Sequence, residues 1–233
     1  MQYSQRAAVL ASVPILSTLP QSTLERVAQS CVWRQHERGT QILDYRDSST
    51  DVFFLLSGKA RAIIYSQDGK AVVFADLKPG AIFGEIAAID GKARSAGVEA
   101  LEACTIASLS ANRFEVLLRT EPAVAMATLR HVAADVRRLS ERVFEFSTLA
   151  VRNRIHAELL RLAGETQQTG PEIVLSPAPS LSDIADRIAT HREAVSRELS
   201  RLSSNGLLRR EGGNLHITDL ARLADLVQDA RGD

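Results

Sequence analysis

Hydrophobic and polar positions change their period twice along this chain of 233 residues. From about residue 33 to residue 109, short apolar runs are separated by turn-forming residues, which is typical of a sandwich or jelly-roll barrel. The runs predict strands at residues 41–45, 52–56, 60–65, 71–77, 98–100 and 104–109. Residues 67–70, Gln-Asp-Gly-Lys, predict a hairpin turn because Asp-Gly accepts a positive φ. The residues before this region are predicted to be helical, with Ser22 as the cap of a short helix.

After Ser110 the period becomes helical, and one seam of apolar residues repeats in steps of three and four. Charged residues flank this seam, so we expect a helix over residues 122–146 that pairs in parallel with the same helix of a second chain. The alternative is a long helix that packs on its own barrel. The residues of the seam are Leu129, Val132, Val136, Leu139, Val143 and Phe146.

The last third of the chain predicts a small mixed domain. Helices are expected at residues 151–162 and after Thr218, with a short strand at 172–175 and a hairpin formed by 207–210 and 215–217. The whole chain is therefore expected to be α+β, with an N-terminal β jelly-roll sensor domain at residues 1–120. A dimerisation helix and hinge would follow at 121–149, and a winged helix-turn-helix domain at 150–233.

Residues 180–203 have the pattern of a helix-turn-helix. Ile184, Ile188, Val195 and Leu199 can form one apolar face shared by two short helices. Thr190 is predicted to cap the second helix, with Glu193 completing a capping box. The N-terminal residues of such a second helix enter the major groove of DNA.

Polar residues cluster on the predicted recognition helix. Arginine can donate two hydrogen bonds to guanine, and a carboxylate such as that of Glu193 can accept one from cytosine. The alternative for Glu193 is a role in the capping box alone. Arg209 and Arg210 on the hairpin are expected to contact phosphates, which adds affinity without sequence information. The residues predicted to face DNA are Thr190, His191, Arg192, Glu193, Ser196, Arg197 and Arg201.

A second informative stretch covers residues 78–96. Gly84 lets the backbone approach a ligand, and a helical turn at 85–89 would direct free N–H groups toward an anion. Arg94 can form a forked pair with a phosphate, and Ser95 adds a hydroxyl donor. Glu85 can accept from a hydroxyl. Together these groups suit a sugar-phosphate with a single charge.

Composition narrows the function further. The 28 basic and 28 acidic residues balance, so any DNA binding must come from a local basic patch. Two cysteines, Cys31 and Cys104, are too few for a four-cysteine zinc or iron–sulfur site and suggest a reducing compartment. His36, His131 and His156 are scattered, so neither haem nor another metal is predicted. No apolar run is long enough to span a membrane, no signal peptide is evident and no catalytic triad is found, which predicts a cytoplasmic protein without enzymatic activity.

Two motifs carry a resemblance that covers nearly the whole chain. The stretch Phe83-Gly84-Glu85-Ile86-Ala87, followed by Arg94-Ser95-Ala96, resembles the phosphate-binding cassette of cyclic-nucleotide domains. The stretch His191-Arg192-Glu193-Ala194-Val195-Ser196-Arg197 resembles the recognition helix of the cyclic-AMP receptor/FNR superfamily of bacterial transcription regulators.

The resemblance implies a homodimer that binds double-stranded DNA, contacts RNA polymerase and responds to cAMP or, less favoured, cGMP. Glu85 would bind the ribose 2′-hydroxyl and Arg94 the cyclic phosphate, with Gly84, Ile86 and Ser95 beside them. Three residues match the base-reading positions and imply a palindrome of TGTGA-like half-sites: Arg192, Glu193 and Arg197.

The chain also departs from the family pattern. Where the family has a Thr-Ser pair that contacts the base of the nucleotide, this chain has Leu139-Ser140, so only Ser140 is expected to make that contact. Ala189 replaces a glycine often found in the helix-turn-helix turn. These departures keep two alternatives open: a ligand-independent regulator whose barrel holds the dimer together, with Glu85 and Arg94 as an internal ion pair, and a barrel that senses another metabolite.

Overall fold

The computed structural model describes residues 3–67, 71–166 and 168–232. The chain forms two compact units: the first contains the described residues up to Tyr65 and Val73–Val136, and the second contains the rest of the described chain. The boundary falls within the long helix α5, Pro122–Thr148, which includes all the residues predicted for the dimerisation helix. Across the described ranges, we find no helix with the length and apolar character that a membrane span requires.

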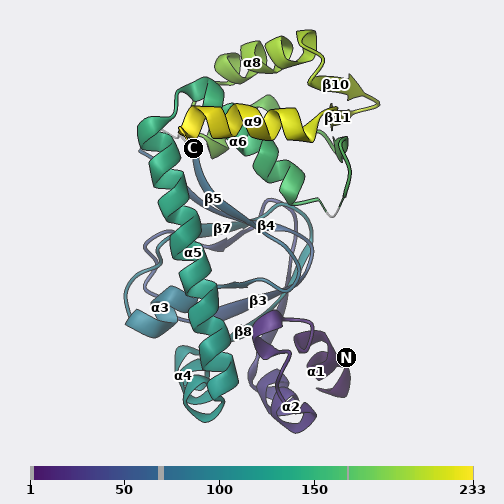
Figure 1. Ribbon diagram of the computed structural model, residues 1–233. Helices are drawn as coiled ribbons and strands as arrows, with labels where there is room; N and C mark the ends of the chain where they lie inside the picture. Colours follow the sequence, from purple (N-terminus) through teal and green to yellow (C-terminus); the bar gives the residue numbers. More distant parts are fainter. Residues whose placement is uncertain (1–2, 68–70, 167, 233) are drawn as a thin grey trace. The chain divides into compact units, whose positions relative to one another are not determined.

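Two antiparallel sheets form the body of the first unit (Figure 1). One sheet has the strand order β1-β8-β3-β6, with β1 at Val32–His36, β8 at Cys104–Leu109, β3 at Val52–Ser57 and β6 at Ile82–Phe83. The other has the order β2-β7-β4-β5, with β2 at Gln41–Leu43, β7 at Gly97–Ala100, β4 at Ala60–Tyr65 and β5 at Ala71–Leu77. The predicted strands and the jelly-roll type of barrel are therefore confirmed, with β1 and β6 as additions.

Helices lie before and after these strands. Helix α1 (Tyr3–Leu10), the 3-10 turn η1 (Pro14–Leu16) and α2 (Gln21–Ser30) come first, α3 (Glu85–Asp90) follows β6, and α4 (Ala111–Thr120) precedes α5. The predicted cap of α2 is wrong, because the helix begins one residue before Ser22 and the backbone carbonyl of Pro20 accepts its first hydrogen bonds. The predicted hairpin turn at residues 67–70 lies outside the described residues.

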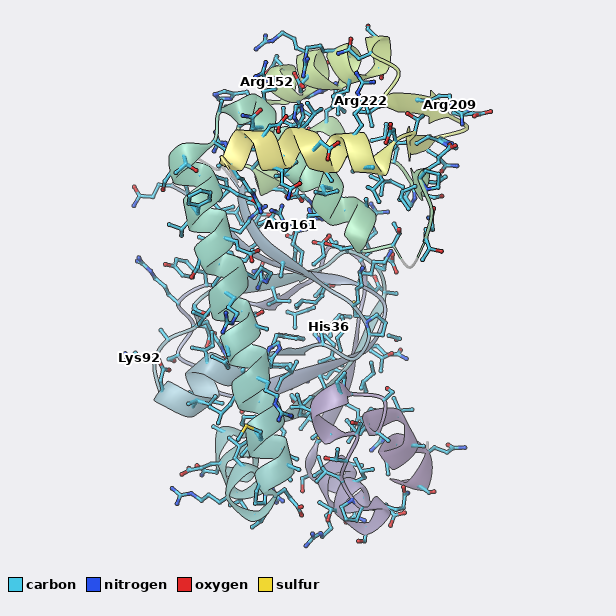
Figure 2. The ribbon with its side chains drawn as sticks, viewed as in Figure 1. His36, Lys92, Arg152, Arg161, Arg209 and Arg222 are labelled. Carbon is cyan, nitrogen blue, oxygen red and sulfur yellow. The ribbon has the colours of Figure 1, made fainter. Side chains whose placement is uncertain are left out.

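The second unit has the helices and the hairpin that the sequence predicts. It contains α6 (Val151–Gly164), β9 (Ile173–Leu175), α7 (Leu181–Arg187), α8 (Arg192–Ser204), β10 (Leu208–Glu211), β11 (Asn214–Ile217) and α9 (Leu220–Arg231). Strands β10 and β11 pair as a hairpin, and β9 joins them in the order β10-β11-β9. Arg209 extends from this wing, as Figure 2 shows.

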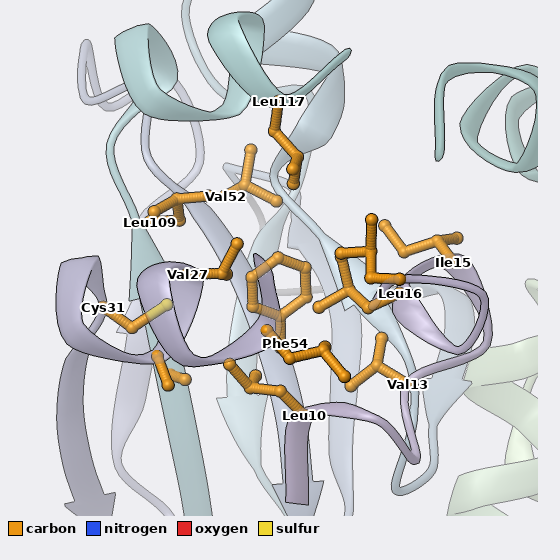
Figure 3. Packing of buried hydrophobic residues seen from close by; sticks show 14 of the residues in the cluster. Leu10, Val13, Ile15, Leu16, Val27, Cys31, Val52, Phe54, Leu109 and Leu117 are labelled. Atoms are coloured by element: carbon orange, nitrogen blue, oxygen red, sulfur yellow. The ribbon is translucent and has the colours of Figure 1, made fainter. Parts of the chain in front are cut away.

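Strand β3 explains how the core of the first unit is built. Successive side chains of a strand point to opposite faces, and Phe54 and Leu55 are both fully buried. Phe54 packs with Leu10 and Leu16 in the cluster under the N-terminal helices (Figure 3). Leu55 belongs instead to the cluster that includes Ile106 and fills the barrel. The continuous apolar run of β3 therefore serves two cores at once.

Candidate functional site

The residues of the predicted cassette form a tight turn between β6 and α3. Gly84 has a φ of +80°, in the left-handed region that favours glycine, and the helical turn predicted after it is confirmed as α3. A Cβ atom at Gly84 would lie 2.6 Å from Nη1 of Arg94 and 2.9 Å from the carbonyl oxygen of Asp51. Only glycine can therefore let Arg94 approach this turn so closely.

Arg94 is buried, with 2% of its surface exposed, and it holds the cassette to the start of β3. Its Nη1 donates to the carbonyl oxygen of Gly84 at 2.9 Å, its Nη2 to that of Asp51 at 2.8 Å, and its Nε to the hydroxyl of Ser49 at 3.2 Å. The guanidinium also lies over the ring of Phe53, which stacks on the ring of Phe83 with 5.1 Å between the ring centroids. Burial lowers the pKa of Arg94 from its ordinary value, while the nearby carboxylates of Asp51, Asp47 and Glu85 act in the opposite direction.

Glu85 and Arg94 both belong to the cassette but do not form an ion pair with each other. Its side chain is buried, and within the described residues no ion pair joins it to Arg94, which removes the internal ion pair expected for an inactive barrel. The nearest cation-forming group is His131 on α5, whose Nε2 is 3.8 Å from a carboxylate oxygen of Glu85. Burial is the main reason that the pKa of Glu85 is raised.

The other predicted ligand residues are distributed between the two units. Within the cassette, Ile86 on α3 and Ser95, directly after Arg94, are exposed. Ser140 is exposed on the part of α5 that belongs to the second unit. The structure thus groups Gly84, Glu85, Ile86, Arg94 and Ser95 in one place, and the contact of Ser140 with a base stays a prediction.

The predicted seam of α5 is open to solvent in the single chain. Leu129 and Val143 are 63% and 65% exposed, and the apolar residues between them, Val136 and Leu139, are also exposed, while Val132 is half-buried. Phe146 departs from a simple seam, because the guanidinium groups of Arg142 and Arg154 lie over its ring at 5.3 and 5.4 Å.

The helix-turn-helix is formed by α7 and α8. Its predicted apolar face is confirmed, since Ile184, Ile188, Val195 and Leu199 are buried in one cluster. Ala189, in the turn, has a φ of +50°, the left-handed conformation for which glycine would be the usual choice. Ala189, which stands where the family pattern often has glycine, is therefore at a position where an L-residue is strained.

The predicted capping box of the recognition helix α8 is wrong. The N-cap residue is His191, and its side chain makes no capping hydrogen bond. Thr190 belongs to the turn, where its backbone N–H donates to the carbonyl oxygen of Ala185. Glu193 is consequently exposed rather than engaged in a cap.

The outer face of α8 carries arginines without a described partner. His191, Arg192, Glu193 and Arg197 are exposed and Ser196 is half-buried. Among the described residues, no ion pair or hydrogen bond involves the guanidinium of Arg192 or that of Arg197. Arginines in this state can donate to base edges or phosphates without first breaking a protein contact.

Arg201 is different, because it is held by a buried group of α8. Its guanidinium donates to both carboxylate oxygens of Glu198 at 2.7 and 2.9 Å, and Nε2 of the buried His156 lies 2.5 Å from the same carboxylate. Burial lowers the pKa of His156 despite this carboxylate. Its Nδ1 is buried without a partner, so a second proton there would have no acceptor.

The wing, which is the hairpin of β10 and β11, carries one arginine held in ion pairs and one without a described ion pair. Arg209 donates to Glu172 at 3.0 Å and to Glu211 at 2.5 Å, whereas Arg210 is exposed and has no described ion pair. His216 contacts the same carboxylate of Glu172 at 2.8 Å. Arg210 is therefore better placed than Arg209 to contact a phosphate.

A network of buried ions that the sequence did not predict stabilises the second unit. Glu158 binds Arg142 at 2.7 Å and Arg187 at 3.4 Å, and it also pairs with Arg161. Glu145 continues the network, since it binds Arg161 and Arg231, each at 2.8 Å. Figure 2 shows Arg161 on α6. Charged residues are frequent on helix surfaces, so no sequence signal distinguishes these buried ones.

Comparison with known proteins agrees with both parts of this description. Residues 33–121 match the family described as the cyclic nucleotide-binding domain, and residues 153–226 match the Crp-like helix-turn-helix domain. The chain is 30% identical over 197 residues to a protein of Thermus thermophilus named cyclic AMP receptor protein, covering 83% of this chain and 87% of that protein.

Solved structures share the fold at lower identity. A CooA mutant from Carboxydothermus hydrogenoformans has a TM-score of 0.79 at 20% identity and covers 92% of this chain and 94% of its own. The regulator CLP of Xanthomonas campestris, described as responsive to c-di-GMP, has a TM-score of 0.73 at 21% identity, with 85% of this chain and 99% of its own covered. The chain therefore belongs to the CRP/FNR family of DNA-binding transcription regulators, which are not enzymes, and combines a cyclic nucleotide-binding domain with a Crp-like helix-turn-helix domain.

Proposed function

We propose that this regulator is a homodimer that binds a cyclic nucleotide, with cAMP favoured over cGMP, and then binds a palindrome of TGTGA-like half-sites with higher affinity. Arg94 would bind the cyclic phosphate and Glu85 the ribose hydroxyl, with Gly84, Ile86 and Ser95 at the ligand and Ser140 at the base.

The observation that carries the nucleotide proposal is the environment of Arg94. A buried charge is costly unless an opposite charge compensates it, and the three groups that Arg94 bonds directly are all neutral, with carboxylates only nearby. A bound phosphate would add a negative charge in direct contact and form charge-assisted hydrogen bonds with the guanidinium. Glu85 supports the same assignment, because its buried carboxylate has no described side-chain hydrogen bond and can accept one from a hydroxyl.

The choice of cAMP rests on the relative from Thermus thermophilus, whose name states that nucleotide. The c-di-GMP response named for CLP indicates that the same fold can serve another nucleotide. Leu139 replaces a hydrogen-bonding residue of the family pattern, so recognition of the base depends on Ser140 and is expected to be less selective.

The DNA proposal rests on the exposed face of α8. Arg192, Glu193 and Arg197 would read bases, because they are exposed at the N-terminal half of a helix that enters the major groove. Thr190, His191, Ser196 and Arg201 would flank them, with Arg201 first releasing Glu198.

Dimerisation is proposed from the exposed seam of α5. A heptad pattern with large apolar residues open to solvent is costly in a single chain and is stabilised when a second copy covers it. A dimer would also present two recognition helices to the two halves of a palindrome. Contact with RNA polymerase is expected for the family, and we assign no residue of this chain to it.

The decisive experiment combines two titrations on the purified full chain. Calorimetry with cAMP, cGMP and c-di-GMP measures ligand binding, and fluorescence anisotropy on a TGTGA-type palindrome measures DNA binding with and without each ligand. We expect cAMP to bind and to tighten DNA binding. In Arg94→Ala we expect ligand-dependent DNA binding to be lost. Lys92→Ala, at an exposed neighbouring position, is the control and should leave both nucleotide and DNA affinity unchanged.

Because Arg94 also holds the cassette, Arg94→Lys provides a second variant that keeps the charge and loses the fork. Circular dichroism of each variant separates lost binding from lost folding. Unchanged affinity for the nucleotide in a folded Arg94 variant would overturn the pocket assignment.

A second candidate function is a regulator that binds DNA without an effector. It is favoured by one observation, namely that Nε, Nη1 and Nη2 of Arg94 each donate a hydrogen bond within the protein itself. Equal DNA affinity with and without every nucleotide, and no calorimetric signal, would establish this second function instead.

A further inference from the structure

Three potential metal ligands converge at the cassette, where no metal motif is evident in the sequence. Glu85 begins α3, while His131 and Asp135 lie four residues apart on α5 and therefore on the same face of that helix. One donor atom from each lies within 4.8 Å of the other two. All three residues belong to the first unit.

The distances place the imidazole within ion-pair range of both carboxylates. Nε2 of His131 is 3.8 Å from a carboxylate oxygen of Glu85 and 3.8 Å from one of Asp135. Both distances exceed those of N–H···O hydrogen bonds, so the imidazole donates no direct hydrogen bond to either carboxylate. Ligands about 2.1 Å from a tetrahedral Zn²⁺ ion lie about 3.4 Å apart, so small side-chain movements would bring these donors to a common ion.

Burial and charge favour a cation at this point. The Glu85 side chain is only 6% exposed, and no described side chain donates a hydrogen bond to it. The donor atoms of the cluster come from two carboxylates and one imidazole. A divalent cation would compensate the charge of the buried Glu85 carboxylate.

We propose that Glu85, His131 and Asp135 form a binding site for a divalent transition-metal ion of the Zn²⁺ type, which fastens the start of α3 to α5. The imidazole favours such an ion over Ca²⁺ or Mg²⁺, which prefer oxygen ligands alone. Three protein ligands leave a coordination position for water, so the ion would be exchangeable. The site needs no nucleotide, and it extends the role of Glu85 beyond the one in the proposed function.

The test is a titration of the full chain with Zn²⁺ in competition with a chromophoric chelator, without nucleotide. We expect one ion per chain to bind at this site. His131→Gln and Asp135→Asn remove one ligand each with little change of shape, and each should weaken Zn²⁺ binding about tenfold or more. His36→Gln, on β1 and outside the cluster, is the matched control and should leave the affinity unchanged.

Thermal melts provide a readout that nonspecific binding to surface histidines would not give. Zn²⁺ should raise the Tm of the unmodified protein and of His36→Gln, and should not raise that of His131→Gln. The melts without metal show that each variant is folded. Zn²⁺ affinity that is equal in His131→Gln, Asp135→Asn and the unmodified protein, or equal binding of Ca²⁺, would overturn the site. Because no nucleotide is present, either outcome leaves the nucleotide titrations as an independent test of the proposed function.

Discussion

The two units treat buried charge in opposite ways. In the first unit, the described hydrogen bonds of the buried guanidinium of Arg94 go to neutral groups, and the buried carboxylate of Glu85 has no ion pair with it. In the second unit, the buried carboxylates of Glu145, Glu158 and Glu198 each bind at least two cationic or imidazole groups. The comparison indicates that the buried charges of the first unit lie near opposite charges without direct ion pairs between Arg94 and a carboxylate, whereas those of the second unit are joined in ion pairs that hold helices together.

The largest effect is expected from Glu158→Gln, because Glu158 is 1% exposed and binds three arginines. Removing one partner of a buried ion network leaves the others uncompensated, which costs about 3–5 kcal/mol of unfolding free energy. Chemical denaturation measures this loss. Glu141→Gln, at an exposed position of α5, should change stability by less than about 0.5 kcal/mol. Similar losses in both variants would show that the second unit does not depend on its ion network.

Gly84→Ala should have the next largest effect, because it adds both backbone strain and a clash with Arg94. A non-glycine residue in a disfavoured backbone region costs about 1–3 kcal/mol. Gly91→Ala is the matched control, since Gly91 also has a positive φ but a Cβ there would meet nothing within 4 Å. The difference in unfolding free energy between the two variants isolates the contact with Arg94, and equal losses would argue against a tightly packed cassette.

Arg197→Ala should weaken DNA binding by about 1–3 kcal/mol and relax the preference at one guanine, because its guanidinium has no described partner in the protein. Arg210→Ala, on the wing, should instead weaken binding to all sequences equally. Anisotropy on a set of single-base variants of the palindrome distinguishes these patterns. A uniform loss in Arg197→Ala would make it a phosphate contact and remove the distinction between α8 and the wing.

The smallest effect is the pH dependence due to His156. Burial lowers the pKa of His156 below its unfolded value of 6.5, so the unfolded chain binds more protons near that pH and stability should fall as the pH drops below about 6.5. His156→Gln should lose this component of the slope, while His191→Gln, at an exposed position, should retain it. Denaturation curves between about pH 7.5 and 5.5 measure the slope, and an unchanged slope in His156→Gln would assign it to other groups.

Periodicity was sufficient to predict most of the fold, because the strands, α5 and the apolar face of the helix-turn-helix follow directly from which positions are apolar. Strand β1 escaped prediction because its sequence, VWRQH, is largely polar and lies at the edge of its sheet. The prediction of Thr190 as a cap is wrong by one residue, since the N-cap is His191 and Thr190 belongs to the turn that contains the left-handed Ala189.

The candidate site was predictable in part. Gly84, Glu85 and Arg94 could be found from their spacing, since the chemistry of a phosphate site requires those residue types close together. The acceptors that hold Arg94, the carbonyl of Asp51 and the hydroxyl of Ser49, come from a segment more than forty residues earlier. The buried ions of the second unit depend on which helix faces meet, and a charged residue in the sequence carries no sign of that.

Strand β3 also determines how slowly the backbone amide hydrogens of the first unit exchange with solvent. Because Phe54 and Leu55 anchor two different cores, exchange of the β3 amide hydrogens requires both clusters to open together. Asp51, whose carbonyl oxygen accepts a hydrogen bond from Arg94, directly precedes this strand. Phe53, whose ring lies under the Arg94 guanidinium, belongs to it. The backbone amides of β3, which position the cassette, should therefore be among the slowest to exchange in the unit. Local openings of neighbouring loops should leave the candidate site intact.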